Sequence, residues 1–278
     1  MADSHEPTCP VCGGSAWRTV LGGQGFSIDT CASGCIARTA PPPEYCADLP
    51  PDARAENLTQ VRPGASGHFT FANRILDLIG RWQPGGRLLD IGSGWGQLLK
   101  SASDRGYDAL GLEASAGVAD IARQAFGVKA VVGVFPERTF EPESFDVVVM
   151  NHVLEHLYDP RAALADVVRI LRPGGVFAVC SPDFQSLMRT IKRTAWQGLQ
   201  PDQHVWQLST ESIRMLMTRA GLVPICANRS SLDYNRGSGS LPKWLALRAI
   251  LMAAQVLGTG DNTIVLARKP RRIESSQP

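Results

Sequence analysis

The sequence predicts an α/β fold in which helices cover both faces of a doubly wound parallel sheet, with a small cysteine-rich unit ahead of it. Three observations support this prediction. Strand-like and helix-like segments alternate between residues 69 and 269. A glycine-rich turn follows an apolar run in LLDIGSGWG, at 88–96. Five of the seven cysteines lie in the first 46 residues. Alternating strands and helices are typical of a parallel sheet, and the cysteines mark the N-terminus as a unit of its own.

The composition is that of an ordinary globular protein, with 44% hydrophobic and 19% charged residues. The formal net charge of +2 is too small to indicate nucleic-acid binding by itself. The first ten residues lack the apolar run of a secretory signal, and no stretch reaches the ~18 apolar residues of a membrane-spanning helix. We therefore expect a cytoplasmic protein.

Composition divides the chain into four parts. The cysteine-rich segment covers 1–46, and the stretch 47–66 is expected to be a linker. The α/β domain is expected to cover 67–270. The polar tail at 271–278 is expected to be disordered.

The α/β domain is expected to begin with a helix over 69–82. Phe71, Ile75 and Ile79 fall near one face of this helix, and QPGG at 83–86 ends it. Apolar segments then predict strands at 87–91, 108–113, 129–133, 144–151, 176–182, 222–229 and 261–269. Segments with helical spacing between them predict helices at 96–106, 115–127, 160–171 and 209–221.

The turn at 92–96 lies at the carboxyl end of a strand, where open α/β sheets bind their ligands. Glu113 ends the next strand, 21 residues after Gly92, where an acid can accept both hydroxyls of a ribose. A nucleoside is therefore expected. Asp90 stands two residues before the first glycine, and beside a pyrophosphate it would face like charge, at a cost of up to several kcal/mol. S-adenosylmethionine carries an ammonium and a sulfonium and no phosphate, so Asp90 favours it.

The sequence here resembles the class I S-adenosylmethionine-dependent methyltransferases over about residues 68–270. The resemblance rests on LLDIGSGWG (88–96), GLE (111–113), FDVVVMNHVLEHLYDP (145–160), LRPGGVFAV (171–179) and DQHVWQLSTESIRMLMTRAGL (202–222). It implies a Rossmann-like, seven-stranded sheet of order 3-2-1-4-5-7-6 with the last strand antiparallel.

The resemblance also implies the roles of individual residues. By this resemblance, Glu113 is expected to bind the ribose, and the segment around Val134 and Phe135 is expected to bind the adenine. Asn151 is expected to contact part of the methionine. The methionine end of the cofactor is expected to contact the glycine turn and the acid before it, which are Asp90, Gly92, Ser93, Gly94 and Gly96. VGVFPE at 132–137 has no acid where many relatives place one for the adenine amine, so backbone groups are expected to recognise the adenine.

Three interpretations stay open for the histidines near the end of the fourth strand. In the first interpretation His156 and Glu155 are both structural: His156 hydrogen-bonds to the backbone, and Glu155 caps a helix or pairs with a neighbour. Alternatively, His204 or His156 is the general base for a hydroxyl acceptor. In the third interpretation these residues and His152 bind a divalent metal, since the layout resembles the Glu-x-x-Glu-His motif of the ubiquinone O-methyltransferases and the small-RNA 3′-end methyltransferases. Here His152 replaces the first Glu, which weakens the case for Mg²⁺.

The N-terminal cysteines have the spacing of a zinc ribbon. Cys9 and Cys12 form C-x2-C, and after eighteen residues Cys31 and Cys35 form C-x3-C. We expect these four to hold a structural zinc ion, with Cys46 as the alternative fourth ligand. The segment resembles the short ribbon that precedes the catalytic domain of some sugar, polysaccharide and secondary-metabolite methyltransferases.

The expected function is S-adenosylmethionine-dependent O- or C-methylation of a small molecule such as a sugar, a lipid-like molecule or a secondary metabolite. An RNA methyltransferase and a non-catalytic S-adenosylmethionine-binding module are the alternatives. The ribbon segment has only two basic residues, Arg18 and Arg38, which gives no strong nucleic-acid signal. The apolar segment 241–257 is either a buried helix or a surface for a lipid-like substrate or a membrane. The sequence does not predict the acceptor atom or the oligomeric state.

Overall fold

The structure is a computed structural model, and it describes residues 8–44, 67–136, 140–230, 252 and 258–271. The expected linker at 47–66 lies outside the described residues, as do the tail beyond residue 271 and all of the segment 241–257 except Met252. Within the described ranges, no helix combines the length and the apolar character needed to cross a membrane.

The described part of the chain forms one large sheet of seven strands in the order β10-β11-β8-β7-β4-β5-β6. These strands are β4 (Arg87–Ile91), β5 (Asp108–Glu113), β6 (Lys129–Val132), β7 (Phe145–Asn151), β8 (Leu171–Pro182), β10 (Val223–Ser230) and β11 (Asn262–Arg268). β11 runs antiparallel to both of its neighbours, and the remaining pairs are parallel. Counted along the chain, this is the expected order 3-2-1-4-5-7-6, which is confirmed.

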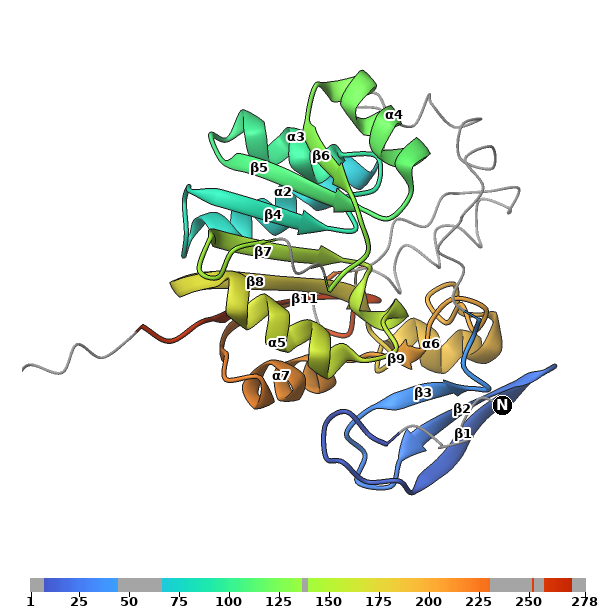
Figure 1. The fold of residues 1–278 in the computed structure, drawn as a ribbon. Coiled ribbons are helices and arrows are strands. Elements are labelled where there is room, and N and C mark those ends of the chain that lie inside the picture. The colour runs from blue at the N-terminus through green and yellow to red at the C-terminus, as the bar shows by residue number, and fades with distance from the viewer. Residues whose placement is uncertain (1–7, 45–66, 137–139, 231–251, 253–257, 272–278) are drawn as a thin grey trace, which may run out of the picture.

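Helices cover both faces of the sheet (Figure 1). One face carries α2 (Gly67–Gly80), α3 (Gln97–Asp104) and α4 (Ala116–Phe126), and the other carries α5 (Pro160–Ile170) and α7 (Thr210–Arg219). Side chains along β7 alternate between the two cores: Val147 and Val149 face the first, and Val148 and Met150 face the second. The apolar run of β7 is therefore buried on both sides, as a central parallel strand requires.

Strand β8 starts earlier than the sequence predicts. The sequence predicts a strand only from residue 176, after RPGG at 172–175 ends the preceding helix, but β8 begins at Leu171. The reason lies in pairing with the chain after β11, because Gly174 N donates to Lys269 O and Lys269 N donates to Gly175 O, both at 2.9 Å. Partners distant in sequence thus extend the strand through a segment whose composition favours a turn.

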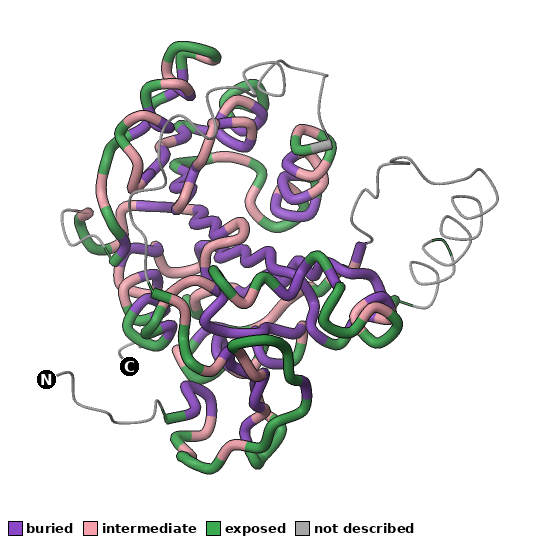
Figure 2. The backbone as a smooth tube through the Cα atoms, turned by 90° about the vertical axis from the view of Figure 1, so that its right-hand side faces the viewer, coloured by how far each residue is buried: buried purple, intermediate pink, exposed green. Residues whose placement is uncertain are grey.

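The N-terminal segment forms an antiparallel sheet that is joined to the α/β domain. Its strands are β1 (Trp17–Gly23), β2 (Phe26–Cys31) and β3 (Ala37–Ala40), and the fourth strand is β9 (Trp206–Gln207) from the α/β domain. Cys9, Val11, Cys31 and Ile36 belong to the same apolar core as α5 and α7. Figure 2 shows buried backbone continuing from the central sheet into this junction, whereas the outer hairpin of the segment is exposed. We call residues 8–44 the ribbon.

Short helical elements connect the strands near the carboxyl edge of the large sheet. The 3-10 turn η2 (Leu154–His156) follows β7. Helix α6 (Leu187–Lys192) and the 3-10 turn η3 (Arg193–Ala195) follow β8. η2 and β9 bring the histidines of the sequence analysis to one edge of the sheet.

Candidate functional site

The turn after β4 adopts a backbone that requires glycine. Gly92 has φ of +70°, and a Cβ atom there would lie 2.4 Å from Cγ2 of Val153. Gly96 has φ of +85° and is the N-cap residue directly before α3. Because only glycine adopts these angles and distances freely, the turn can pass directly beneath the residues that follow β7.

Asp90 lies under this turn and is 2% exposed. One carboxylate oxygen, Oδ1, is buried without a hydrogen-bond partner. Burial raises the pKa of Asp90 to about 8, and the charge of Glu113 adds to the rise. A positive ligand at this edge would favour the ionised form of the carboxyl group.

Glu113 ties the end of β5 to the glycine turn. Its Oε2 accepts a hydrogen bond from Gly94 N at 2.8 Å, and its Oε1 accepts one from Ser115 N at 3.1 Å. The side chain is 9% exposed. Its carboxylate is therefore held at the mouth of the turn, where it can also accept hydroxyl groups from a ligand.

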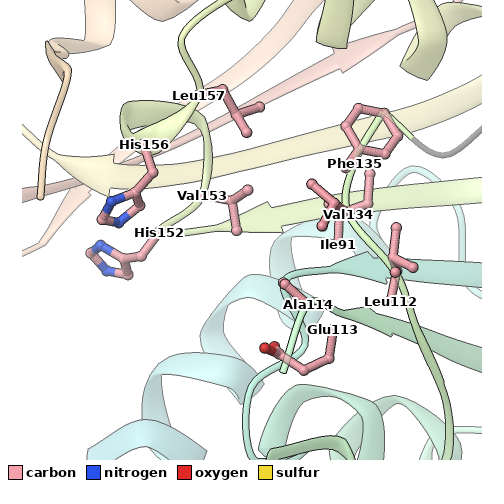
Figure 3. Close-up of a pocket in the computed structure, with 12 residues that line it drawn as sticks. Ile91, Leu112, Glu113, Ala114, Val134, Phe135, His152, Val153, His156 and Leu157 are labelled. Carbon is pink, nitrogen blue, oxygen red and sulfur yellow. The ribbon is translucent and has the colours of Figure 1, made fainter. Parts of the chain in front are cut away.

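A pocket opens at the carboxyl edge of β4, β5 and β7 (Figure 3). Glu113 and Ala114 form one side of the pocket in Figure 3, and His152 and His156 come from the chain after β7 on another side. The pocket is lined by Ile91, Gly92, Leu112, Glu113, Ala114, Gly133, Val134, Phe135, His152, Val153, His156 and Leu157. One cavity thus joins the glycine turn to the histidines.

Six residues predicted from the sequence line this pocket: Gly92, Glu113, Val134, Phe135, His152 and His156. The other predicted residues are not part of the lining: Asp90, Ser93, Gly94, Gly96, Asn151, Glu155 and His204. Val153 and Leu157 also line the pocket, and the sequence did not predict them as site residues. Their positions follow from η2, which turns the chain back at the end of β7, and a single 3-10 turn has no periodic signal that would identify it.

Six buried polar atoms without a hydrogen-bond partner lie around this edge. Those of the glycine turn and of the chain around the end of β7 are Asp90 Oδ1, Ser93 Oγ, Trp95 Nε1, Gln97 Nε2, Asn151 Oδ1 and Glu155 Oε2. Native proteins leave few such atoms, and each one needs an explanation. A polar ligand with both donors and acceptors would satisfy the atoms at this edge.

The histidines form a cluster with Glu155. His152 has a left-handed backbone, with φ of 56°, and its Nδ1 donates to Glu155 Oε1 at 3.2 Å. Nδ1 of His156 donates to Gln203 O at 3.0 Å. The rings of His156 and His204 lie 4.8 Å apart between centroids. Ligand atoms of Glu155, His156 and His204 all lie within 4.8 Å of one another.

Electrostatics set the charge states within this cluster. Burial by itself raises the pKa of Glu155, but the hydrogen bond from His152 and the charges of the three histidines outweigh it and bring the pKa down to about 2. Burial lowers the pKa of His204 to about 4, although the charge of Glu155 acts in the opposite direction. Glu155 is therefore an anion and His204 a neutral imidazole at pH 7. These are the states in which both groups bind metals.

Each open interpretation of the histidines finds some support in this geometry. His156 bonds to the backbone and Glu155 pairs with His152, as the structural interpretation expects. The same bond leaves Nε2 of His156 as an acceptor, which both a general base and a metal ligand need. His204 also hydrogen-bonds to the backbone, at Gly198.

The ribbon cysteines converge as their spacing predicts. Sulfur atoms of Cys9, Cys12, Cys31 and Cys35 all lie within 4.8 Å of one another, with Cys12 and Cys31 Sγ 3.4 Å apart. Cys9 and Cys31 are buried. Cys46, the alternative fourth ligand, lies outside the described residues. Four thiol groups at this separation can hold one tetrahedral metal ion.

Comparison with known proteins decides the family. A family model described as a methyltransferase domain matches residues 67–227. The chain belongs to the methyltransferase family. Its fold is the Rossmann-like fold that the resemblance of its motifs implies.

Curated relatives are similar to parts of this methyltransferase. An uncharacterized 37.1 kDa protein in a transposon of Streptomyces fradiae is 30% identical over 203 residues, which cover 70% of this chain and 56% of that protein. A ubiquinone biosynthesis O-methyltransferase of Cereibacter sphaeroides is 31% identical over 166 residues, covering 55% of this chain and 66% of that enzyme. The chain spans about half the length of the curated relatives it matches.

Solved structures share the fold of this methyltransferase. The methyltransferase in a complex with the Trm112 methyltransferase activator from Haloferax volcanii has a TM-score of 0.61 at 20% identity, covering 80% of this chain and 98% of that one. An S-adenosylmethionine-dependent methyltransferase of Thermotoga maritima has a TM-score of 0.57 at 22% identity, covering 78% of this chain and 95% of that one.

We predict that S-adenosylmethionine binding releases a proton from Asp90. With a pKa of about 8, this carboxyl group is about 90% protonated at pH 7 before binding. The cationic cofactor favours the ionised form, so the proton leaves, and affinity rises as the pH approaches 8. Calorimetry at pH 7 in buffers of different ionisation enthalpy should find about 0.9 proton released per cofactor bound.

Asp90→Asn is the control, because it keeps the shape of the side chain and cannot ionise. It should bind the cofactor more weakly and lose this proton release. Equal proton release by the parent and by the variant would contradict the assignment to Asp90.

Proposed function

We propose that the enzyme transfers the methyl group of S-adenosylmethionine to a hydroxyl group of a small molecule. The observation that carries the proposal is the shared pocket, which has Gly92 and Glu113 of the expected cofactor site and His156 of the histidine cluster in its lining. Methyl transfer from a sulfonium is an in-line displacement, so the acceptor must lie beside the cofactor. A pocket that joins both sets of residues provides this arrangement.

The residues at the glycine turn fit S-adenosylmethionine. In this proposal, Glu113 accepts the ribose hydroxyls, while Asp90 faces the positive charge of the methionine part. Buried donors and acceptors of the turn, among them Ser93 Oγ and Trp95 Nε1, gain partners from the cofactor. Val134 and Phe135 line the pocket where the adenine is expected, and the nearby backbone would recognise its polar edge.

The histidine cluster fits a divalent metal better than it fits a lone base. One nitrogen of His156 and one of His204 bond to backbone groups, at Gln203 and Gly198, which orients each ring as in metal sites. Oε2 of Glu155 is buried without a partner beside them. Two imidazoles and one carboxylate suit Zn²⁺ or Fe²⁺ better than Mg²⁺. We infer that Glu155, His156 and His204 hold a metal ion, which would lower the pKa of an acceptor hydroxyl.

The names of relatives support an oxygen acceptor. Ubiquinone biosynthesis O-methyltransferases of Hahella chejuensis and Cereibacter sphaeroides match 33% and 55% of this chain, at 37% and 31% identity. A malonyl-[acyl-carrier protein] O-methyltransferase of Serratia marcescens matches 48% of it, at 30% identity. A phenol or catechol is the acceptor class that we infer from these names and from the cluster.

The ribbon has few basic side chains that could contact RNA. Of its two basic residues, Arg38 is 6% exposed and lies over the ring of Trp17 at 4.4 Å. It also pairs with Asp29 at 3.6 Å. Arg18 alone does not make the basic surface that RNA binding requires.

We propose further that the four ribbon cysteines bind a structural zinc ion. Their sulfur atoms converge, and a unit of this size rarely folds without metal or disulfide bonds. All four positions of a tetrahedral ion would be filled by thiolates, which leaves none for a substrate.

The zinc proposal predicts about one zinc ion per chain in the ribbon. Cys9→Ser should lower the zinc content measured by elemental analysis, because three thiolates bind more weakly than four. Cys226→Ser, on β10, is the matched control and should keep the zinc. Full zinc content in Cys9→Ser would argue against the site.

The cluster proposal predicts that activity depends on a chelatable metal. With S-adenosylmethionine and small catechols, a chelator too weak to strip a tetrathiolate site should abolish turnover, and divalent ions should restore it. His156→Ala and His204→Ala should lower turnover by about 10²–10⁴-fold while cofactor affinity changes little. Glu155→Gln should lose one bound metal ion, measured independently of activity.

Other outcomes separate the remaining interpretations. If the chelator has no effect but His156→Ala still lowers turnover by this factor, His156 acts as a base and the metal proposal is wrong. If activity survives the chelator and both histidine variants, catalysis rests on proximity alone.

A further inference from the structure

The ribbon shares its sheet with the segment that carries His204. β3 pairs antiparallel with β9, with Ala37 opposite Gln207 and Arg38 opposite Trp206. β9 starts two residues after His204. The backbone that presents this histidine therefore continues directly into a strand of the ribbon's sheet.

Thr39 of β3 makes the closest polar contacts in this junction. Its backbone N donates to Val205 O at 2.9 Å, and its Oγ1 donates to His204 O at 2.6 Å. The same hydroxyl accepts a hydrogen bond from Nε2 of Gln207 at 3.2 Å. Thr39 is 1% exposed, so these bonds are shielded from water.

The remaining contacts of His204 come from its own domain. Its backbone N donates to Gln200 O at 2.8 Å, and its ring bonds to the backbone of Gly198. Beyond it, Nε1 of Trp206 donates to Leu157 O at 2.8 Å, next to His156. The hydroxyl of Thr39 is thus the contact through which the ribbon fixes the His204 carbonyl.

A short path connects Thr39 to the cysteine cluster. Cys31 ends β2, and its N donates to Ile36 O at 2.9 Å, directly before β3. Thr39 lies four residues after Cys35, about 13 Å along an extended strand. Within the ribbon, Thr39 pairs with Ile28 of β2. The backbone around the cysteine cluster therefore fixes the position of β3, and with it the position of the Thr39 hydroxyl.

We propose that Thr39 is a positioning residue for His204, and that the ribbon is a structural part of the histidine cluster rather than an independent binding unit. The proposal rests on the proposed role of the histidine cluster in methyl transfer. The hydroxyl holds the His204 carbonyl from one side while β9 pairing fixes the residues that follow. Loss of the hydroxyl should shift the imidazole away from Glu155 and His156.

A spectroscopic experiment tests this proposal without any acceptor. Ring ¹⁵N–¹H correlations of the full-length protein, labelled at histidine, are assigned through His204→Gln. Thr39→Val keeps the β-branched shape and the backbone N–H but removes the hydroxyl, and it should move or broaden the His204 ring signals. Thr39→Ser restores the hydroxyl and should return them toward their parent positions.

Thr19→Val is the matched control, because the Thr19 hydroxyl donates to Asp29 Oδ1 at 2.8 Å and its bond stays inside the ribbon. This control should leave the His204 signals unchanged. Unchanged His204 signals in Thr39→Val, or an equal change in Thr19→Val, would overturn the proposal.

Turnover and affinity provide the second readout. With a catechol acceptor, Thr39→Val should lower kcat by about 10–100-fold, since it displaces a group near the chemistry, while S-adenosylmethionine affinity and the zinc held by the ribbon cysteines stay unchanged. Thr39→Ser should recover most of that loss. Equal loss in Thr39→Ser would overturn the proposal. Failure of the proposed function would appear separately, as full activity in His204→Gln, while the spectroscopic comparison still tests the contact.

Discussion

The structure depends on one constraint: strands β4, β5 and β7 run parallel, so their carboxyl ends meet at one edge and bring acidic side chains together there. Asp90 and Glu155 each keep a buried carboxylate oxygen without a protein partner. Such atoms cost free energy unless a ligand satisfies them. The two buried carboxyl groups differ in charge state. Asp90 takes up a proton near neutral pH, whereas Glu155 stays ionised among three histidines. In the proposed function, Asp90 then faces a cation of the cofactor, and Glu155 faces a metal ion at the histidines.

The elements that cover this edge are short and hold one another in place. η2 presents His156 from the α/β domain, and β9 follows His204. The indole of Trp206 bonds to Leu157 O, and Thr39 bonds to His204 O. A two-residue strand would not be stable alone, and the ribbon's sheet supplies its pairing. The histidine cluster thus depends on contacts from both parts of the chain, which gives the ribbon a structural reason to precede this domain.

Much of the fold and part of the site could be predicted from the sequence, for physical reasons. The apolar run of β7 and the glycines at 92–96 follow from local chemistry, and the resemblance of the motifs supplied the strand order. Pairing between distant segments could not be predicted: β9 is too short for a periodic pattern, and the early start of β8 depends on Lys269. The cysteine spacing predicted the four-sulfur cluster but gave no sign that Thr39 would reach His204, because that contact spans 165 positions of the chain.

The central claim is that acidic side chains at this edge bind S-adenosylmethionine, and calorimetry on Glu113→Ala tests it most directly. Loss of hydrogen bonds to this carboxylate should weaken binding by about 1.5–3 kcal/mol, or about 10- to 150-fold in the dissociation constant. Glu113→Gln keeps one acceptor oxygen and should fall between Glu113→Ala and the parent, while Glu211→Ala, at the exposed start of α7, should bind as the parent does. A dissociation constant for Glu113→Ala equal to that of the parent would contradict the account.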